Sequence, residues 1–356
     1  MTESLSRLQI EKRESHLSPY AARSKDGIRN RTDPPCPVRN EFQRDRDRII
    51  HSKSFRRLKH KTQVFIAPIG DHYVTRLTHT LEVAQIARTI TRALYLNEDL
   101  SEAISLGHDL GHTPFGHVGE AVLDNLYPNG FRHADQSIRI VESIEKEGKG
   151  LNLTQQVRQG IANHSKPQGD FFGNKMPASL SLEGQICRVS DAIAYLNHDL
   201  GDAFRAEVLS ISDLPKSTLD VLGPKHSQRI NTMVTDIVIA SWDATGEQGF
   251  SSNQIPRIQM GKKVRLALNQ LREFMFEKIY MVEDKSEESE TARRVITLLN
   301  EYFTRNRDLI PSEYKDSSKV VVDYISGMTD HYALEVAEKI EPGVTGVFRN
   351  KIGMRR

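Results

Sequence analysis

The chain has 356 residues, of which 38% are hydrophobic, and 49 lysines and arginines nearly balance 47 aspartates and glutamates. It has no run of about 18 apolar residues, which excludes a membrane-spanning helix, and its first residues lack the apolar segment of a secretion signal. The two cysteines, Cys36 and Cys187, have no metal-binding spacing and provide no disulfide framework. We therefore expect a soluble, cytoplasmic protein with one good hydrophobic core.

The first forty residues are rich in arginine, proline and polar side chains, and we expect residues 1–40 to form an extended N-terminal arm. Residues 41–356 should form the core. Apolar residues recur there at helical spacing and strict alternation is rare, which predicts an all-α fold. The predicted helices span about 76–96, 98–109, 115–127, 134–146, 153–164, 181–209, 228–240, 262–280, 289–305 and 317–339.

A basic segment covers residues 44–61, where eight of the eighteen residues are Lys or Arg and two are Asp. Such a cluster can bind the phosphates of a nucleotide or a nucleic acid. It can equally be a solvated helix face whose Arg and Asp residues pair at helical spacing. The charge pattern leaves both interpretations open.

Four stretches between the predicted helices are expected to lack helical structure. Residues 165–179, 212–227 and 243–256 are predicted loops, and the acidic stretch 283–290 is a predicted connection. No internal repeat is evident, so we expect one helical domain. Its metal-binding helices should cover about 70–205 and its C-terminal helical part about 228–340.

Two histidines and two aspartates suggest a metal site. His108 and Asp109 are adjacent, so their side chains diverge by about 100° and further ligands must come from elsewhere. His79 lies on the preceding predicted helix, and Asp191 lies on an otherwise apolar helix face, where a carboxylate is costly unless it is paired. Each of these residues alone has an ordinary structural explanation. Together, the order H…HD…D on three helices predicts a mixed N/O site for Mn, Mg, Fe, Ni, Co or Zn.

The glycines and the proline in HDLGHTPFGH (108–117) break the helix after the predicted ligands. A new helix near Phe115 would place His117 and Glu120 on one face, three residues apart. A carboxylate beside an imidazole fixes its tautomer and favours its charged form, as general acid–base catalysis requires. Arg76 precedes His79 by three residues and can reach a phosphate at the same ion.

Six segments of the sequence, which include the H…HD…D residues and HDLGHTPFGH, resemble the bacterial dGTP triphosphohydrolase-like family of the HD-domain metal phosphohydrolases. The resemblance implies an α-helical HD fold, one catalytic metal ion per subunit, and hydrolysis of a deoxynucleoside triphosphate to deoxynucleoside and triphosphate. The matching segments are EFQRDRDRIIHSKSFRRLKHKTQVF (41–65), RLTHTLEVAQIAR (76–88), HDLGHTPFGHVGE (108–120), GFRHADQSIRI (130–140), SDAIAYLNHDLGDAF (190–204) and VVDYISGMTDHYALE (321–335).

The resemblance also implies roles for individual side chains. His117 and Glu120 match the family's catalytic dyad, and His133 has a counterpart in its pocket. His112 either contacts phosphate or forms a hydrogen bond within the loop. We assign no chemistry to the segment 321–335, which resembles a closing helix.

Tyr195 and Asp199 follow Asp191 by four and eight residues, so they share its helix face. By resemblance to the vertebrate dNTPase of the superfamily, Tyr195 would pack beneath the deoxyribose and exclude a 2′-hydroxyl, and Asp199 would accept a hydrogen bond from the 3′-hydroxyl. Core packing is the alternative for Tyr195. Arg56 and Arg57 are candidate contacts to triphosphate or to an effector nucleotide.

The resemblance further implies a homo-oligomer, a tetramer or a hexamer, and a nucleotide activator is one candidate partner. Single-stranded DNA is another, through Arg44, Arg46 and Arg48. Mn or Mg is the first choice of cofactor. Two alternatives to a dNTP triphosphohydrolase stay open: an HD-type phosphohydrolase acting on other nucleotides, and a nucleotide- or DNA-binding regulator with weak hydrolysis.

Overall fold

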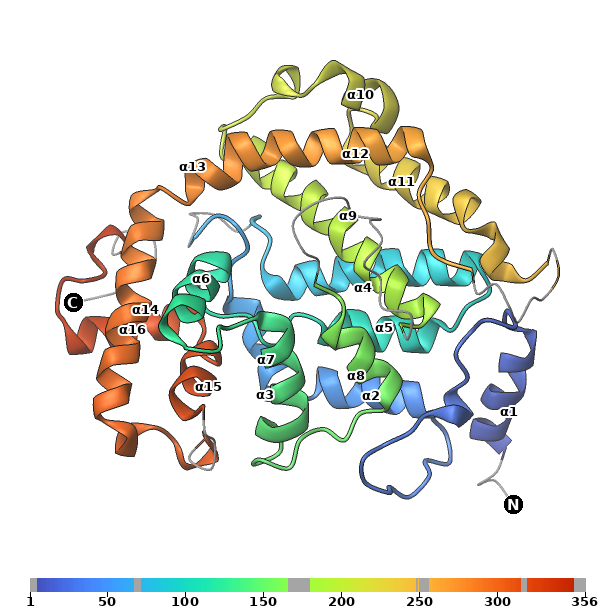
Figure 1. Cartoon of the computed structure of the whole chain (residues 1–356), viewed down its shortest axis with the longest axis horizontal. Coiled ribbons are helices and arrows are strands. Elements are labelled where there is room, and N and C mark those ends of the chain that lie inside the picture. Colours follow the sequence, from blue (N-terminus) through green and yellow to red (C-terminus); the bar gives the residue numbers. More distant parts are fainter. Residues whose placement is uncertain are drawn as a thin grey trace. The chain divides into compact units, whose positions relative to one another are not determined.

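The computed structural model describes residues 5–66, 72–165, 180–247, 249, 256–314 and 319–348 (Figure 1). These residues form helices and no strand, and one isolated antiparallel bridge joins Thr62 to Thr75. The prediction of an all-α fold is confirmed. Within the described ranges, no helix is both long enough and apolar enough to cross a membrane.

The chain divides into two compact units made of non-consecutive segments. Unit 1 comprises Met1–His51, Thr80–His108 and Leu151–Phe274, and unit 2 comprises Ser52–His79, Asp109–Gly150 and Met275–Arg356. Residues on both sides of position 40 belong to unit 1. The division into an arm and a core at that position stays a prediction.

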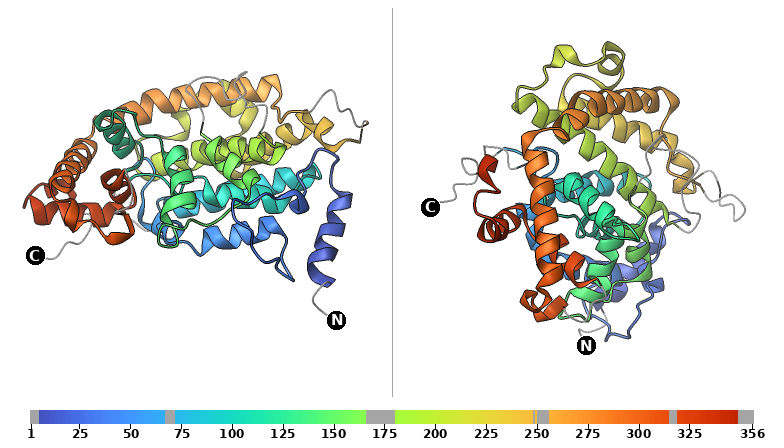
Figure 2. Two further views of the ribbon diagram at one scale, coloured as in Figure 1. Left: turned by 60° about the horizontal axis from the view of Figure 1, so that its bottom comes forward. Right: turned by 60° about the vertical axis from the view of Figure 1, so that its left-hand side comes forward.

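Unit 1 is built around α5 (Glu98–Gly107), which contacts α2 (Glu41–Ile50), α8 (Gln155–Ala162) and α9 (Leu182–Arg205) (Figures 1 and 2). Asn97 caps α5, because its side chain accepts a hydrogen bond from the Leu100 amide. The unit also holds α1 (Leu5–Arg13), α10 (Lys216–Leu222), α11 (His226–Ala240), most of α4 (Arg76–Ala93) and most of α12 (Lys262–Met275).

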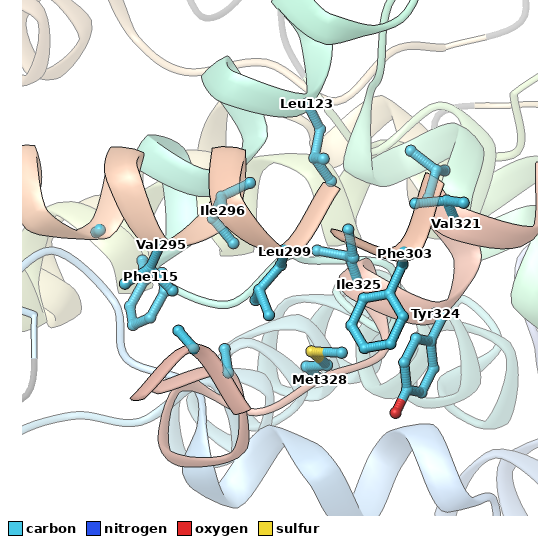
Figure 3. Packing of buried hydrophobic residues seen from close by; sticks show 14 of the residues in the cluster. Phe115, Leu123, Val295, Ile296, Leu299, Phe303, Val321, Tyr324, Ile325 and Met328 are labelled. Atoms are coloured by element: carbon cyan, nitrogen blue, oxygen red, sulfur yellow. The ribbon is translucent and has the colours of Figure 1, made fainter. Parts of the chain in front are cut away.

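Unit 2 contains α3 (Lys53–Arg57), α6 (Gly116–Leu126), α7 (His133–Arg139), α13 (Met281–Glu283), α14 (Glu287–Arg305), α15 (Val320–Ser326) and α16 (Asp330–Ile340). Its core forms where α14 packs on α6, α15 and α16. Figure 3 shows this core, in which Leu299 of α14 lies among side chains of the other helices. Phe115, which immediately precedes α6, is part of the same buried cluster. The apolar spacing of α14 therefore anchors the segment that leads into α6.

Several predicted boundaries are wrong. The expected extended arm contains α1 at Leu5–Arg13. The expected loop 212–227 contains α10, and α14 begins at Glu287, inside the expected connection 283–290. For α14 the cause is local, because the Ser286 side chain caps the helix and acidic residues occupy its first turn.

Other differences concern helices that are divided. The helix predicted at 317–339 is two helices, α15 and α16, separated at Gly327–Thr329. The helices predicted at 134–146 and 262–280 continue into π-helical turns at Ile140–Ile144 and Phe276–Tyr280. Residues 166–179 and most of 248–255 belong to predicted loops and lie outside the described residues.

Candidate active site

The four predicted metal ligands are shared equally between the two units. His79 and Asp109 belong to unit 2, whereas His108 and Asp191 belong to unit 1. His108 and Asp109 are consecutive, so one peptide bond connects the two pairs.

In unit 2, the Asp109 carboxylate lies among three basic side chains. Arg76, the first residue of α4, donates a hydrogen bond from Nη1 to Asp109 Oδ2 over 2.9 Å. His79 lies one turn later, with Nε2 3.9 Å from the same oxygen, and His112 Nε2 is 3.4 Å from Asp109 Oδ1. All four residues are at most 3% exposed. A buried carboxylate surrounded by imidazoles can serve as a metal ligand or bind a cationic partner.

A second grouping in unit 2 involves His133, from the start of α7. Ligand atoms of Asp109, His112 and His133 all lie within 4.8 Å of one another, so this cluster could hold a metal ion. The His112 and His133 rings stack at 4.0 Å with an interplanar angle of 15°. The structure therefore places His112 beside the predicted ligand Asp109.

The predicted dyad of His117 and Glu120 includes a third member. Glu120 Oε2 is 3.6 Å from His117 Nδ1, but Glu120 Oε1 is only 2.8 Å from His133 Nδ1 and also accepts from the His133 amide at 2.8 Å. His117 has a side chain that is 58% exposed. Glu120 thus connects the half-buried His133 with the more exposed His117, which is accessible to a ligand.

The charges of this triad stabilise one another. Burial by itself would raise the pKa of Glu120, but hydrogen bonds and charges from His117 and His133 outweigh burial and hold that pKa far below its usual range. Burial would likewise lower the pKa of His133, yet the Glu120 carboxylate and, more weakly, Asp109 raise it. The triad therefore favours an ionised carboxylate beside a protonated imidazole.

The helix break within HDLGHTPFGH depends on Gly111 and on the backbone of Phe115. A Cβ atom on Gly111 would lie 2.3 Å from the His133 carbonyl oxygen and from the Ser137 amide nitrogen, so only glycine fits. Phe115 has a left-handed backbone with φ of 60°, and α6 begins directly after it. The turn lets α6 start in a new direction, with His117 on its first turn.

Two buried residues brace this turn, and neither was predicted from the sequence. Lys61 Nζ donates to the carbonyl oxygens of His112 and, over 2.8 Å, of Ser326. Asp330 accepts hydrogen bonds from the Phe115 amide at 3.0 Å and from the amide and hydroxyl of Thr62. The segment 321–335, to which we assigned no chemistry, therefore supports the loop that carries the candidate ligands.

Burial also affects the pKa of Lys61. It lowers the pKa of this amine to about 7, and the charge of Arg57 acts in the same direction, while Asp330 opposes it. Nothing in the sequence distinguished Lys61 from the other cations of the basic segment, because its burial depends on residues far along the chain.

The side chains of Arg76 and Gln63 in unit 2 have buried polar atoms that form no hydrogen bond within the described residues. Within the described part of the chain, Arg76 Nε and Nη2 are buried and have no hydrogen-bond partner, and the same holds for both polar atoms of the Gln63 side chain. Buried polar atoms without partners are costly. A bound anionic or polar ligand would satisfy them. Gln63 is a further residue that the sequence did not indicate.

In unit 1, His108 follows α5 directly, and its Nδ1 lies 2.6 Å from the Ser105 carbonyl oxygen. That contact assigns the proton to Nδ1 and makes Nε2 the lone-pair nitrogen. Nε2 is 4.0 Å from Asp191 Oδ1, a separation that allows both atoms to bind one ion at about 2.0–2.2 Å each. The ring of His164, another residue that the sequence did not indicate, lies 4.9 Å from the His108 ring.

Tyr195 and Asp199 lie on α9, C-terminal to Asp191, as predicted. Asp199 is fully buried, Tyr195 is half-buried, and the buried His198 lies between them in sequence. His198 Nδ1 is 3.0 Å from Asp199 Oδ1, and its ring meets the Tyr195 ring edge-on at 5.8 Å.

The basic segment is largely committed to intramolecular pairs. Arg44 pairs with Glu41, Arg46 with Glu102, and Arg48 with Asp33. Arg56 is exposed, and Arg57 donates from Nη1 to the Tyr314 hydroxyl at 3.1 Å. The pairing favours the interpretation of a solvated, ion-paired helix face, and binding of DNA or of an effector stays a prediction.

Comparisons with known proteins agree with the helical fold. The HD domain family model matches residues 76–196, and the model described as phosphohydrolase-associated domain matches residues 258–339. The chain therefore has the helical fold of an HD-domain phosphohydrolase.

Individual relatives identify the family within the HD-domain phosphohydrolases. A deoxyguanosinetriphosphate triphosphohydrolase-like protein from Caldanaerobacter subterraneus subsp. tengcongensis is 54% identical over 325 residues, which cover 89% of this chain and 90% of the relative. Proteins of the same name from Desulfatibacillum aliphaticivorans and Clostridium tetani are 44% and 48% identical, covering 94% and 83% of this chain and 97% and 84% of the relatives. The chain belongs to the family of deoxyguanosinetriphosphate triphosphohydrolase-like proteins.

Proposed function

We propose that this protein hydrolyses deoxynucleoside triphosphates to deoxynucleoside and inorganic triphosphate with the help of a divalent metal ion. One observation carries the proposal: the buried Arg76 guanidinium is fixed by Asp109 and keeps two N–H-bearing nitrogens without partners among the described residues. A buried guanidinium with free donors is suited to phosphate oxygens. The names of the relatives, deoxyguanosinetriphosphate triphosphohydrolase-like proteins, support the choice of a nucleoside triphosphate as substrate.

The residues present fit a divalent ion. His79, His108, Asp109 and Asp191 would hold it, a set of two imidazoles and two carboxylates that suits Mn or Mg and also Ni, Co, Fe or Zn. The bond from Nδ1 of His108 to the Ser105 carbonyl is the kind of support that orients a ligating imidazole. When bound, the ion polarises a phosphoryl oxygen and lowers the pKa of a water molecule.

The chain's own side chains supply positioning and proton transfer. Arg76 and His112 would bind phosphate oxygens, and in the low dielectric of a buried site such donors strongly stabilise developing charge. His117, the accessible histidine of the triad, would transfer a proton to the leaving 5′-oxygen or from water. Glu120 and His133 would keep His117 oriented through the contacts described above.

Sugar recognition is assigned to α9. Tyr195 would lie beneath the deoxyribose ring and exclude a 2′-hydroxyl, and Asp199 would accept a hydrogen bond from the 3′-hydroxyl. The predicted core of residues 41–356 would carry this entire activity. A homo-oligomer and a nucleotide activator remain predictions that the family resemblance implies.

Product analysis tests the proposal directly. The full-length protein is incubated with each of the four dNTPs, alone and in mixtures, with Mn or Mg, and the products are resolved by anion exchange. We expect intact triphosphate and a deoxynucleoside in equal amounts. Release of pyrophosphate or orthophosphate as the first product, or turnover of only nucleoside monophosphates or cyclic nucleotides, would replace the proposal with an HD phosphohydrolase of another type.

A further inference from the structure

His198 occupies a position on α9 between the two residues assigned to the sugar. Its Nδ1 lies 3.0 Å from Asp199 Oδ1, with both side chains at most 2% exposed. Its ring meets the Tyr195 ring edge-on, with centroids 5.8 Å apart and planes at 74°. One side chain therefore contacts both sugar-binding residues and is too deeply buried to be a surface histidine.

The charges around His198 come from three helices of unit 1. Glu82 of α4 and Asp199 and Asp202 of α9 are negative, and Asp202 also pairs with Arg205. His226 and the buried Arg229, both of α11, are the basic side chains of the same region. Burial alone would lower the pKa of His198, but Asp199, Glu82 and Asp202 outweigh it and raise that pKa. The surroundings thus favour an imidazolium.

A charged His198 has a consequence for Asp199. Asp199 and Asp202 are buried and Glu82 is half-buried, and carboxylates gathered in one region repel one another. An imidazolium at 3.0 Å offsets this repulsion and fixes the rotamer of the Asp199 side chain.

We propose that His198 is a positioning residue for sugar recognition: it holds the Asp199 carboxylate oriented toward the 3′-hydroxyl, and its ring holds Tyr195 where a 2′-hydroxyl would clash. The inference rests on the proposed function and extends it, because it assigns the sugar specificity to a residue that does not itself touch substrate.

The test compares His198→Gln with the unaltered protein. Glutamine keeps an amide donor near Asp199 but has no charge and no ring. For the dNTP that is turned over fastest, kcat/KM is measured against the 2′,3′-dideoxy analogue and against the ribonucleotide. We expect the preference over each analogue to fall about 10- to 100-fold in His198→Gln. This is the range for losing a hydrogen bond to a charged group, here the bond from the 3′-hydroxyl to Asp199. Most of the change should appear in KM.

The pH dependence provides a second measurement that needs no variant. Because the pKa of His198 is raised, its charged form persists above the usual histidine range of about 6.5 and is lost as pH rises through the higher value. In the unaltered protein the preference for the 3′-hydroxyl should therefore be present at low pH and decline with rising pH. In His198→Gln the preference should be independent of pH.

The matched control is His226→Gln, which removes an exposed histidine of α11 near the same cluster. It should leave both preferences unchanged. Equal preferences in a folded His198→Gln protein, or a flat pH profile of the preference in the unaltered protein, would overturn the inference while the release of triphosphate still supports the proposed function. If no dNTP yields triphosphate, the proposed function fails and this inference fails with it.

Discussion

At the scale of single residues, the main distinction is between buried and accessible histidines. His79, His108 and His112 are almost completely buried, whereas the side chain of His117 is 58% exposed. A residue that transfers a proton to or from substrate has to reach it, so accessibility supports the role of His117. The sequence placed Glu120 beside His117, but the structure puts the shorter contact at His133.

The His117 assignment predicts a specific variant. In His117→Ala, turnover should fall by about 10²–10⁴-fold, which is the usual contribution of a general acid or base. Metal content, measured by elemental analysis, should stay normal, because the alanine leaves all four proposed ligands in place. The exposed His331, replaced by alanine in the same way, is the control. A His117→Ala protein with undiminished turnover would remove His117 from the mechanism.

At the scale of elements, the turn between α5 and α6 depends on the beginning of α16. Asp330 accepts three hydrogen bonds there, from Thr62 and from the Phe115 amide, and it is 5% exposed. The bond to Phe115 holds the residue whose left-handed backbone starts α6. A helix more than 200 positions along the chain therefore stabilises the turn that leads to His117.

Asp330→Asn should test this support. The substitution keeps the side-chain shape but replaces an acceptor oxygen by an amide donor that faces other donors. Leaving buried donors unsatisfied costs about 1–3 kcal/mol, so the midpoint of urea unfolding should shift downward accordingly. The control is Glu335→Gln, which removes an exposed ion pair with Lys339 on the same helix and should cost less than about 0.5 kcal/mol. Equal midpoints for the two variants would show that the turn does not need Asp330.

At the scale of the whole molecule, the proposed ligands come in two pairs, one pair from each compact unit. If all four bind one ion, substitution of a single ligand in either unit should abolish the increase in stability that the metal produces. An ion that binds only the native state at 100 times its dissociation constant stabilises it by about 2.7 kcal/mol.

Metal removal makes that expectation measurable. Adding Mn to chelator-treated protein should raise the melting temperature and restore turnover. His79→Ala in unit 2 and Asp191→Ala in unit 1 should each eliminate the shift, while His16→Ala, at an exposed position of unit 1, should retain it. A full shift in either ligand variant would exclude that residue from the metal site.

The sequence by itself determined the helical class, the approximate positions of most helices, and the residues of the H…HD…D pattern with His117 and Glu120. It could do so because helical periodicity, capping at Asn97 and the breaks at Gly111 and Pro114 are local properties of consecutive residues. Only the tertiary structure decided that Glu120 contacts His133, that Lys61 and Asp330 brace the turn, and that Glu82 lies near His198. Those relations join residues that are distant in the chain, and their burial and charge arise from packing that no local pattern encodes.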